Sequence, residues 1–319
     1  MYCYNITLFV NPPSVDDKGA LMRTILVVLA LLAGPAKAQV PNVVTDIAPV
    51  QSLTALVMGD LGQPVLLLDP EVDPHDFQMR PSQTRAMANA DLVIWMGAAL
   101  TPWMGRMIDT LGNGDTASLQ LLGLSDLPML IDGQRVTFAD NQQATDDRNL
   151  DPHAWLDPQN AARFVAEIAE VLSAADPDNA SAYRTNAAET RTRLSAMFDA
   201  LVLQLQPTGD TALVTYHDAY RYFMTRFDLQ FAGSLAPSDA APPSAARIAE
   251  IRDLLAANPT ACVFGEPGAN PKLIKAVLPD PDTVITELGP LNAGQPPGPG
   301  FYEALIRRLA NTIAACADR

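Results

Sequence analysis

The sequence predicts an α/β protein made of two βα lobes with mainly parallel sheets, joined by one long rigid helix. Short apolar segments of strand length alternate with helical patterns in both halves of the chain, and this alternation is typical of parallel sheets. Between the halves lies a long helical stretch without glycine or proline. We therefore expect each half of the chain to form one lobe, and the long helix between the halves to connect the two lobes.

Strands and helices are expected in alternation along each half. In the first half we expect strands at residues 42–47, 63–69, 91–97 and 128–132, with helices at 48–62 and 81–90. In the second half we expect strands at residues 211–217, 229–235, 261–266 and 282–288, with helices at 218–228, 244–259 and 270–280.

The residues between the halves predict two helices. Asp157 is a favourable N-cap for the first, and Pro158 is a favourable first helical residue. The second helix is too long, at about 1.5 Å per residue, to be a crossover inside one small sheet. We expect it to be a stiff strut between the lobes. The predicted parts are a signal region at 1–38, an N-terminal metal-binding lobe at 39–177, a connecting helix at 178–206 and a C-terminal lobe at 207–319.

The N-terminus has the pattern of a secretory signal peptide. From Met22, a basic Arg23 precedes an apolar run over residues 25–33, and a small-x-small ending follows at residues 36–38. The run is shorter than the roughly 20 residues that span a bilayer, which disfavours a membrane span. We expect cleavage after Ala38 and a true start at Met22. Because proline stands where a lipid-bearing cysteine would fall, no lipoprotein is expected.

The chain is strongly acidic, with a formal net charge of −15. Such a chain would repel a polyanion, so nucleic acid is excluded as a partner. No later apolar run reaches the length of a membrane span, and we expect the mature chain to be soluble.

Three cysteines occur, and Cys3 lies before the predicted start. Cys262 and Cys316 remain as an even pair in an oxidising compartment, which favours a disulfide between the last helix and the second sheet. Two buried free thiols are the alternative.

Only three histidines occur, and each leads into a helix: His75 in "DPHDF", His153 in "DPHAW" and His217 in "TYHDA". Loops beyond the carboxyl ends of strands converge on the ligand crevice in open α/β sheets, so these imidazoles are expected to share one cleft. Neutral imidazole suits Zn2+, whereas Mn2+ favours carboxylates. Surface or hydrogen-bonded core histidines are the alternative.

Longer stretches around these histidines resemble a known family. "PHDFQMRPSQTRAMANADLVIWMG", "DPHAWLDPQNAARFV", "TYHDAYRYFMTRFDLQ" and "CVFGEPGANPKLIKAV" closely resemble the ZnuA-like zinc receptors of bacterial ABC importers, the cluster A-I solute-binding proteins. The resemblance runs from about residue 42 to the C-terminus. It implies a periplasmic protein of two βα lobes joined by a rigid helix, with a metal in the cleft between the lobes.

The resemblance also implies a ligand set and a partner. His75 and His153 match metal ligands of the first lobe, and His217 matches a ligand of the second, where manganese-type relatives commonly have glutamate. Zn2+ is therefore the implied ion. Cys262 and Cys316 match the disulfide of the zinc group. The implied function is delivery of zinc to the membrane permease of an ABC importer by a monomer that catalyses no reaction.

The chain departs from the family at two places. The stretch at residues 132–149, which we expect to be a mobile surface loop, lacks the histidines that many zinc receptors carry there. The family's late aspartate falls at Gly289, with Glu287 two residues earlier. The fourth ligand is therefore left open between Glu287, water and a nearby carboxylate such as Asp73.

Four carboxylates near the histidines are candidates for a supporting role. Asp76, Asp151 and Asp218 could each orient an imidazole N–H, or could serve as helix-start residues that the helix dipole favours. Glu266 is expected to support a ligand or to cap a helix rather than to bind the metal.

Two other functions remain in view. A manganese or iron receptor of the same family would share the fold and differ in its ligands. A secreted zinc hydrolase would also use three histidines and water, but its metal would have to be open to a substrate.

Overall fold

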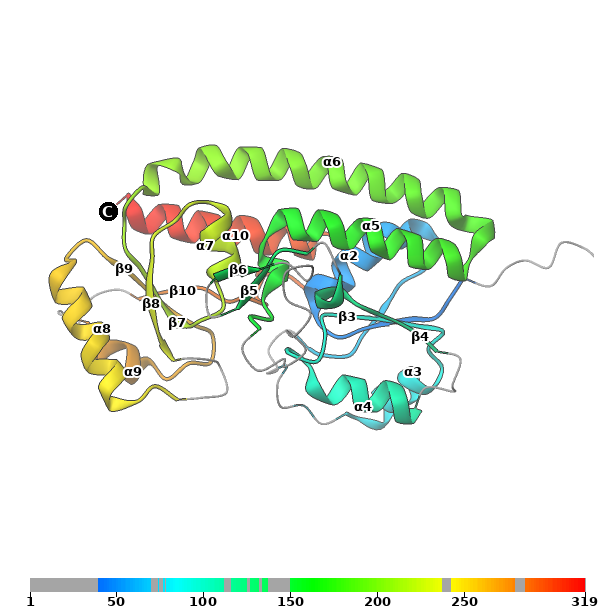
Figure 1. Ribbon diagram of the computed structural model, residues 1–319, viewed down its shortest axis with the longest axis horizontal. Helices are drawn as coiled ribbons and strands as arrows, with labels where there is room; N and C mark the ends of the chain where they lie inside the picture. The colour runs from blue at the N-terminus through cyan, green and yellow to red at the C-terminus, as the bar shows by residue number, and fades with distance from the viewer. Residues whose placement is uncertain are drawn as a thin grey trace, which may run out of the picture. The chain divides into compact units, whose positions relative to one another are not determined.

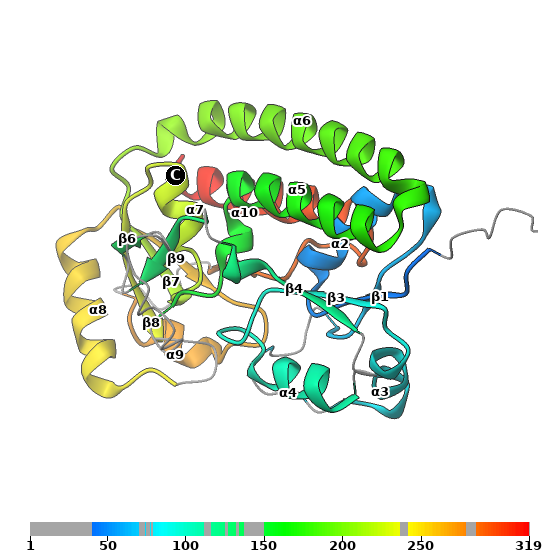
Figure 2. The same cartoon turned by 45° about the vertical axis from the view of Figure 1, so that its right-hand side comes forward.

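Two four-stranded parallel sheets and the helices around them make up the computed structural model, and they confirm the predicted fold class (Figure 1). Figure 2 shows the same elements from a second direction. The predicted signal region lies outside the described residues. The structure describes residues 40–69, 74, 77, 79–111, 116–124, 127–131, 134–136, 150–236, 242–278 and 285–318.

The first sheet contains strands from the first half of the chain only, in the order β2-β1-β3-β4, and all of its pairings are parallel. β1 and β3 are buried along their whole length, as expected for inner strands of a parallel sheet, and apart from Thr45 their residues are apolar. The sequence analysis missed β4, because its residues are half-buried or exposed and form no apolar run. The strands are β1 (Val43–Thr45), β2 (Val65–Leu66), β3 (Leu92–Trp95) and β4 (Ala117–Gln120).

The strand expected at residues 128–132 does not join the first sheet. Its residues form β5 (Met129–Ile131), which pairs antiparallel with β6 (Gln134–Val136). β6 lies inside the stretch 132–149 that we expected to be a loop, and the other residues of that stretch lie outside the described part of the chain. An apolar run indicates a strand, but the turn that follows decides the strand's partner.

The second sheet has the order β10-β9-β7-β8, again with parallel pairings only. β7 lies between β9 and β8, so the residue that ends β7 stands at the middle of the sheet edge. The strands are β7 (Leu213–His217), β8 (Phe231–Ala236), β9 (Cys262–Gly265) and β10 (Thr286–Glu287).

The longest helix, α6, has 26 residues and packs alongside α5, α2 and α10 (Figure 1). The sequence analysis missed α4. No helix among the described residues is long and apolar enough to cross a bilayer. The helices are α2 (Ala48–Met58), α3 (Pro81–Ala88), α4 (Pro102–Leu111), α5 (Pro158–Ala175), α6 (Ala180–Leu205), α7 (Arg221–Arg226), α8 (Ala245–Ala257), α9 (Pro271–Lys275) and α10 (Phe301–Ala317), with short 3-10 turns η1 (Gly59–Leu61), η2 (Leu121–Gly123), η4 (Ala154–Leu156), η5 (Pro177–Asn179) and η6 (Gln206–Thr208).

The main hydrophobic core is shared by the two halves of the chain. It includes Val44 of β1, Leu201 of α6 and Phe301 of α10, all about fully buried. A smaller core lies under α8 and includes Ile251 and Leu255. A core that several helices from both halves share resists bending, because close-packed side chains cannot slide past one another without opening voids.

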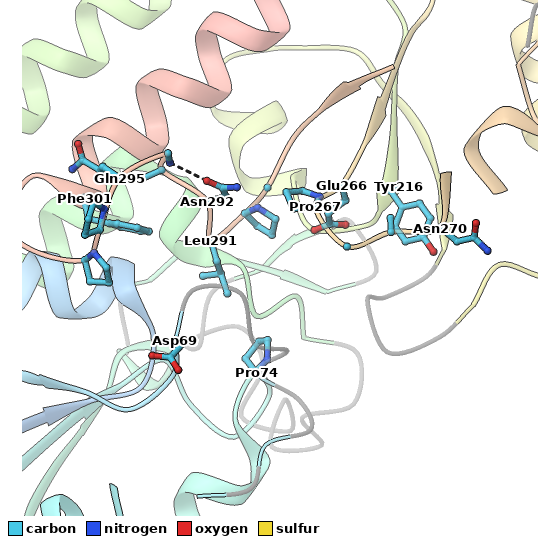
Figure 3. A pocket seen from close by; sticks show the side chains of 18 residues that line it. Asp69, Pro74, Tyr216, Glu266, Pro267, Asn270, Leu291, Asn292, Gln295 and Phe301 are labelled. Carbon is cyan, nitrogen blue, oxygen red and sulfur yellow. Dashed lines mark hydrogen bonds between the residues drawn. The ribbon is translucent and has the colours of Figure 1, made fainter. Parts of the chain in front are cut away.

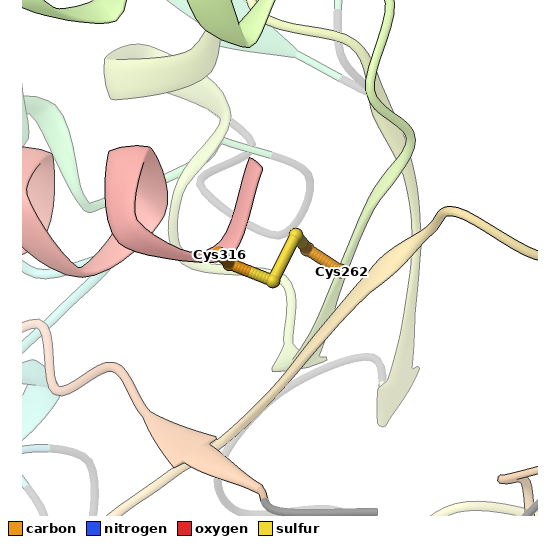
Figure 4. Close-up of a disulfide and its surroundings, with 2 residues drawn as sticks. All are labelled: Cys262 and Cys316. Atoms are coloured by element: carbon orange, nitrogen blue, oxygen red, sulfur yellow. A yellow bond between two sulfur atoms is a disulfide. The ribbon is translucent and has the colours of Figure 1, made fainter. Parts of the chain in front are cut away.

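A disulfide joins Cys262, the first residue of β9, to Cys316 near the end of α10 (Figure 4). This bond confirms the pairing expected from the sequence. It ties the last helix of the chain to the second sheet across a sequence separation of 54 residues.

Asp46 is a fully buried carboxyl group that follows β1. It accepts hydrogen bonds from the backbone N–H groups of Ile47 at 2.8 Å and Met96 at 2.9 Å. Met96 directly follows β3, so this carboxyl group ties the ends of two neighbouring strands together. Burial is the largest influence on this group and raises the pKa of Asp46 from 3.8 to about 6.

Removing the disulfide is expected to lower the free energy of unfolding by about 2–4 kcal/mol, because the unfolded chain gains freedom when a long loop is opened. Urea unfolding of the oxidised protein, the reduced protein and the C262A/C316A variant measures this. Reductant should lower the midpoint of the wild type and leave that of the double variant unchanged. Equal midpoints for the oxidised and reduced wild type would contradict the prediction.

Asp46 should make the free energy of unfolding depend on pH. The pKa of Asp46 in the folded chain, about 6, exceeds its ordinary value of 3.8, so the folded chain binds the proton more tightly. The resulting stabilisation is full below the ordinary value and is lost as the pH rises through the folded one. From pH 7 to pH 5 this group therefore adds about 1 kcal/mol. The D46N variant should lack that increment in denaturant titrations at the two pH values, and parallel pH profiles for both proteins would refute it.

Candidate metal centre

His153 lies in the turn that leads into α5 and is 6% exposed. Its Nδ1 is 2.8 Å from an Asp151 carboxylate oxygen, which also accepts the backbone N–H of His153 at 2.9 Å. The single turn η4 follows at once, and Asp157 then caps α5 by accepting from the N–H of Gln159 at 2.8 Å. This cap and the Pro158 start confirm the predicted beginning of the helix.

His217 is the last residue of β7 and is 1% exposed. Its Nδ1 contacts a carboxylate oxygen of Glu266, the residue that follows β9. The parallel register of β7 and β9 pairs Leu213 with Cys262. The same offset brings Glu266 level with His217, so the sheet itself places this carboxylate beside the ring.

The two imidazoles come from different halves of the chain and lie side by side. Their ring centroids are 5.5 Å apart, with an interplanar angle of 54°. Two imidazoles that bind one tetrahedral Zn2+ at about 2.0 Å have centroids roughly 5 Å apart. The spacing of His153 and His217 therefore suits a single shared ion.

In each ring Nδ1 has a carboxylate partner, so a metal would be bound through Nε2. Hydrogen bonding of the second nitrogen to a carboxylate fixes the tautomer and raises the basicity of the ligand. Asp151 and Glu266 are themselves largely shielded from solvent, at 10% and 13% side-chain exposure. Their charge acts at short range through surroundings of low polarity, where it favours a nearby cation.

The remaining predicted site residues differ in where they lie. His75 and Asp76, like Asp73, lie outside the described residues, although Pro74 is buried and accepts from Trp103 Nε1 at 2.9 Å. Asp218 does not face an imidazole: its carboxylate accepts from Arg221 Nε at 2.7 Å. Within the described residues, no group of three or more His, Cys, Asp or Glu side chains is arranged to hold a metal ion.

A cleft of about 1200 Å³ opens next to Glu266 (Figure 3). Asp69 and Pro74 line it on the side of the first sheet, and Tyr216 and Glu266 line it on the side of the second. Of the described residues that line it, none is one of the two imidazoles. The cleft therefore reaches the carboxylate that contacts His217, while the rings of His153 and His217 are 6% and 1% exposed.

The two positions considered for a fourth ligand, 287 and 289, differ in whether they line the cleft. Glu287 ends β10 with an exposed side chain and does not line it. Gly289 does line it, and a Cβ there would meet the Cβ of Asn292 at 2.8 Å and the Cγ of Pro267 at 3.2 Å. An aspartate does not fit at position 289 unless these neighbours move.

The sequence analysis missed the contacts that hold the segment around His153. Arg226 Nη2 donates to Asp157 at 2.6 Å, Trp155 Nε1 donates to the carbonyl of Pro290 at 3.0 Å, and the Tyr302 hydroxyl donates to the carbonyl of Trp155 at 2.8 Å. These partners lie far apart in the chain, so no local spacing signals them.

Known proteins match the chain over nearly its whole described length. The profile of a family described as zinc-uptake complex component A, periplasmic, matches residues 43–316. A high-affinity zinc uptake system protein ZnuA from Paracoccus denitrificans is 38% identical, over 93% of this chain and 99% of the relative. A protein of the same description from Brucella suis is 31% identical, over 87% of this chain and 92% of the relative.

Solved structures share the fold. A crystal structure of ZnuA superposes with a TM-score of 0.72 at 23% identity, over 86% of this chain and 98% of that one. The receptor FpvC from Pseudomonas aeruginosa, solved in complex with Mn2+, gives a TM-score of 0.73 at 21% identity, over 87% of this chain and 98% of that one. Because structures with either description match about equally well, the fold alone does not select the ion.

Replacing Glu266 by glutamine should weaken zinc binding by about 10- to 100-fold, because the neutral amide keeps the size of the side chain but loses the charge that holds His217. Titration of zinc against a competing chelator measures the affinity. The matched control is D218N, whose wild-type carboxylate bonds Arg221 instead of an imidazole. The prediction is wrong if E266Q and D218N bind zinc equally well.

Proposed function

The chain belongs to the periplasmic zinc-uptake complex component A family, and from this premise we propose that it is a receptor that captures Zn2+ and delivers it to the membrane permease of an ABC importer. One observation carries the proposal: two buried imidazoles from different halves of the chain lie 5.5 Å apart, each with a carboxylate at its second nitrogen.

His75, His153 and His217 are the proposed ligands. The placement of Pro74 at the cleft supports the first, since the next residue in the chain is His75. Water is favoured as the fourth ligand over Glu287, whose side chain is exposed. Neutral imidazoles bind Zn2+ better than Mn2+. A site of three histidines therefore favours zinc over manganese as the bound ion.

The mechanism is ligand exchange without a reaction. Zinc exchanges most of its water for imidazole nitrogen as it enters the buried pair, and the carboxylates of Asp151 and Glu266 compensate part of its charge from behind the rings. A hydrolase would need room at the metal for a substrate, whereas His153 and His217 are only 6% and 1% exposed. Burial of the imidazoles therefore supports a receptor over an enzyme.

The family description also supports a periplasmic location, reached by cleavage of the signal peptide predicted at residues 22–38. We propose a soluble monomer without a lipid anchor, which diffuses to the permease with its zinc.

Replacing His153 by alanine should weaken zinc binding by at least about 100-fold, since a direct ligand contributes more than a residue that only orients one. Calorimetric titration with Zn2+ and Mn2+ measures both affinities, and the wild type should prefer zinc. Thermal unfolding gives an independent reading, because ligand at about 100 times its Kd stabilises the fold by about 2.7 kcal/mol.

The Q295A variant is the control, because Gln295 lines the cleft and is not one of the proposed ligands. It should bind zinc like the wild type. Undiminished zinc affinity in H153A, in a variant that melts normally without metal, would remove His153 from the site.

A further inference from the structure

Residues 151–157, here called the bridging segment, contain a proposed ligand and are held by the second half of the chain. The segment begins at Asp151, which holds His153, and ends at Asp157, which caps α5. Its partners lie on α7, which follows His217 along the chain, and near the start of α10.

The first of these contacts is an ion pair between Asp157 and Arg226. Arg226 Nε lies 2.8 Å from both carboxylate oxygens of Asp157, and Nη2 donates to one of them at 2.6 Å. The Asp157 side chain is 4% exposed and the Arg226 side chain is 15% exposed. Every other arginine–carboxylate pair in the described part of the chain is more exposed, so solvent screens this pair least.

Asp157 is coupled to His153 by a single tight turn. The N–H of Leu156 donates to the carbonyl of His153 at 3.1 Å, and the N–H of Asp157 donates to the carbonyl of Ala154 at 3.3 Å. All three residues of the turn are buried. A displacement of Asp157 therefore moves the imidazole of His153 with it.

Arg226 is coupled to the other imidazole through α7. This helix starts four residues after His217, and Tyr222, Phe223 and Met224 of α7 are buried. The Tyr222 hydroxyl also reaches the bridging segment, where it donates to the carbonyl of Asp151 at 3.3 Å. α7 thus holds the segment at both ends.

The opposite side of the segment is held as well. Trp155 Nε1 donates to the carbonyl of Pro290, and the Tyr302 hydroxyl donates to the carbonyl of Trp155. None of these groups is a proposed metal ligand. The separation of the two imidazoles therefore depends also on contacts between groups that are not metal ligands.

We propose that Arg226 is a positioning residue of the zinc site: through Asp157 it holds His153 at the distance from His217 that one zinc ion requires. This inference rests on the proposed function. A site arranged in advance binds more tightly, because little ordering remains to be done when the ion arrives. A fixed distance between the two imidazoles also favours Zn2+, which accepts tetrahedral coordination by imidazole, over Mn2+, which prefers oxygen ligands.

The test compares R226A, R226K and D157N with the wild-type protein. Asparagine remains a good N-cap, so D157N keeps the start of α5 while removing the charge that Arg226 needs. Lysine keeps the charge but not the two-pronged guanidinium, so R226K should be intermediate. These two variants keep the test open should R226A fail to fold.

R221A is the matched control, because it removes an arginine of the same helix whose partner, Asp218, lies in the same half of the chain. Zinc affinity is measured by chelator competition. The visible absorption of bound Co2+ is measured alongside, since it depends on the coordination geometry and not on fold stability.

We expect R226A and D157N to lose about 10- to 100-fold in zinc affinity and to change the Co2+ spectrum, while R221A stays close to the wild type. Wild-type affinity in R226A, an equal loss in R221A, or an unchanged Co2+ spectrum in a weakened R226A would each overturn the inference. A wild-type protein that binds no zinc would overturn the proposed function instead, so the two failures are distinct.

Discussion

An imidazole buried away from water can bind a cation only if its second nitrogen keeps a hydrogen-bond partner, because an unpaired buried polar group is costly. His153 and His217 satisfy this constraint in the same way, each with a carboxylate at Nδ1. The arrangement orients both rings and places negative charge behind them. The rest of the site depends on it: without those carboxylates neither ring has a defined orientation, and their 5.5 Å spacing has no chemical meaning.

The two rings reach this common arrangement by different structural routes. Asp151 is two residues from His153, so a local turn supplies the partner. Glu266 is 49 residues from His217, and only the pairing of β7 with β9 brings them together. The contact between Asp151 and His153 is therefore local, whereas the contact between Glu266 and His217 requires an intact second sheet. The disulfide from Cys262 to α10 anchors that same strand.

The packing around the site favours a protein with little freedom between its lobes. A hydrophobic core spans both halves, α6 runs beside helices from each, and the bridging segment is bonded to the second half on two sides. A receptor built in this way selects its ion mainly by a preset geometry rather than by closing around it.

Local features of the sequence determined much of this protein. The alternation of apolar runs and helical patterns predicted two parallel sheets, Asp157 and Pro158 predicted the start of α5, and the even pair of cysteines predicted the disulfide. Tertiary structure alone decided that Glu266 contacts His217, that Asp218 bonds Arg221, and that Arg226 bonds Asp157. The physical reason is that periodicity and caps are properties of neighbouring residues. Strand partners and the choice of a buried charge's counterion are set by which distant residues the packed fold brings within a few ångströms.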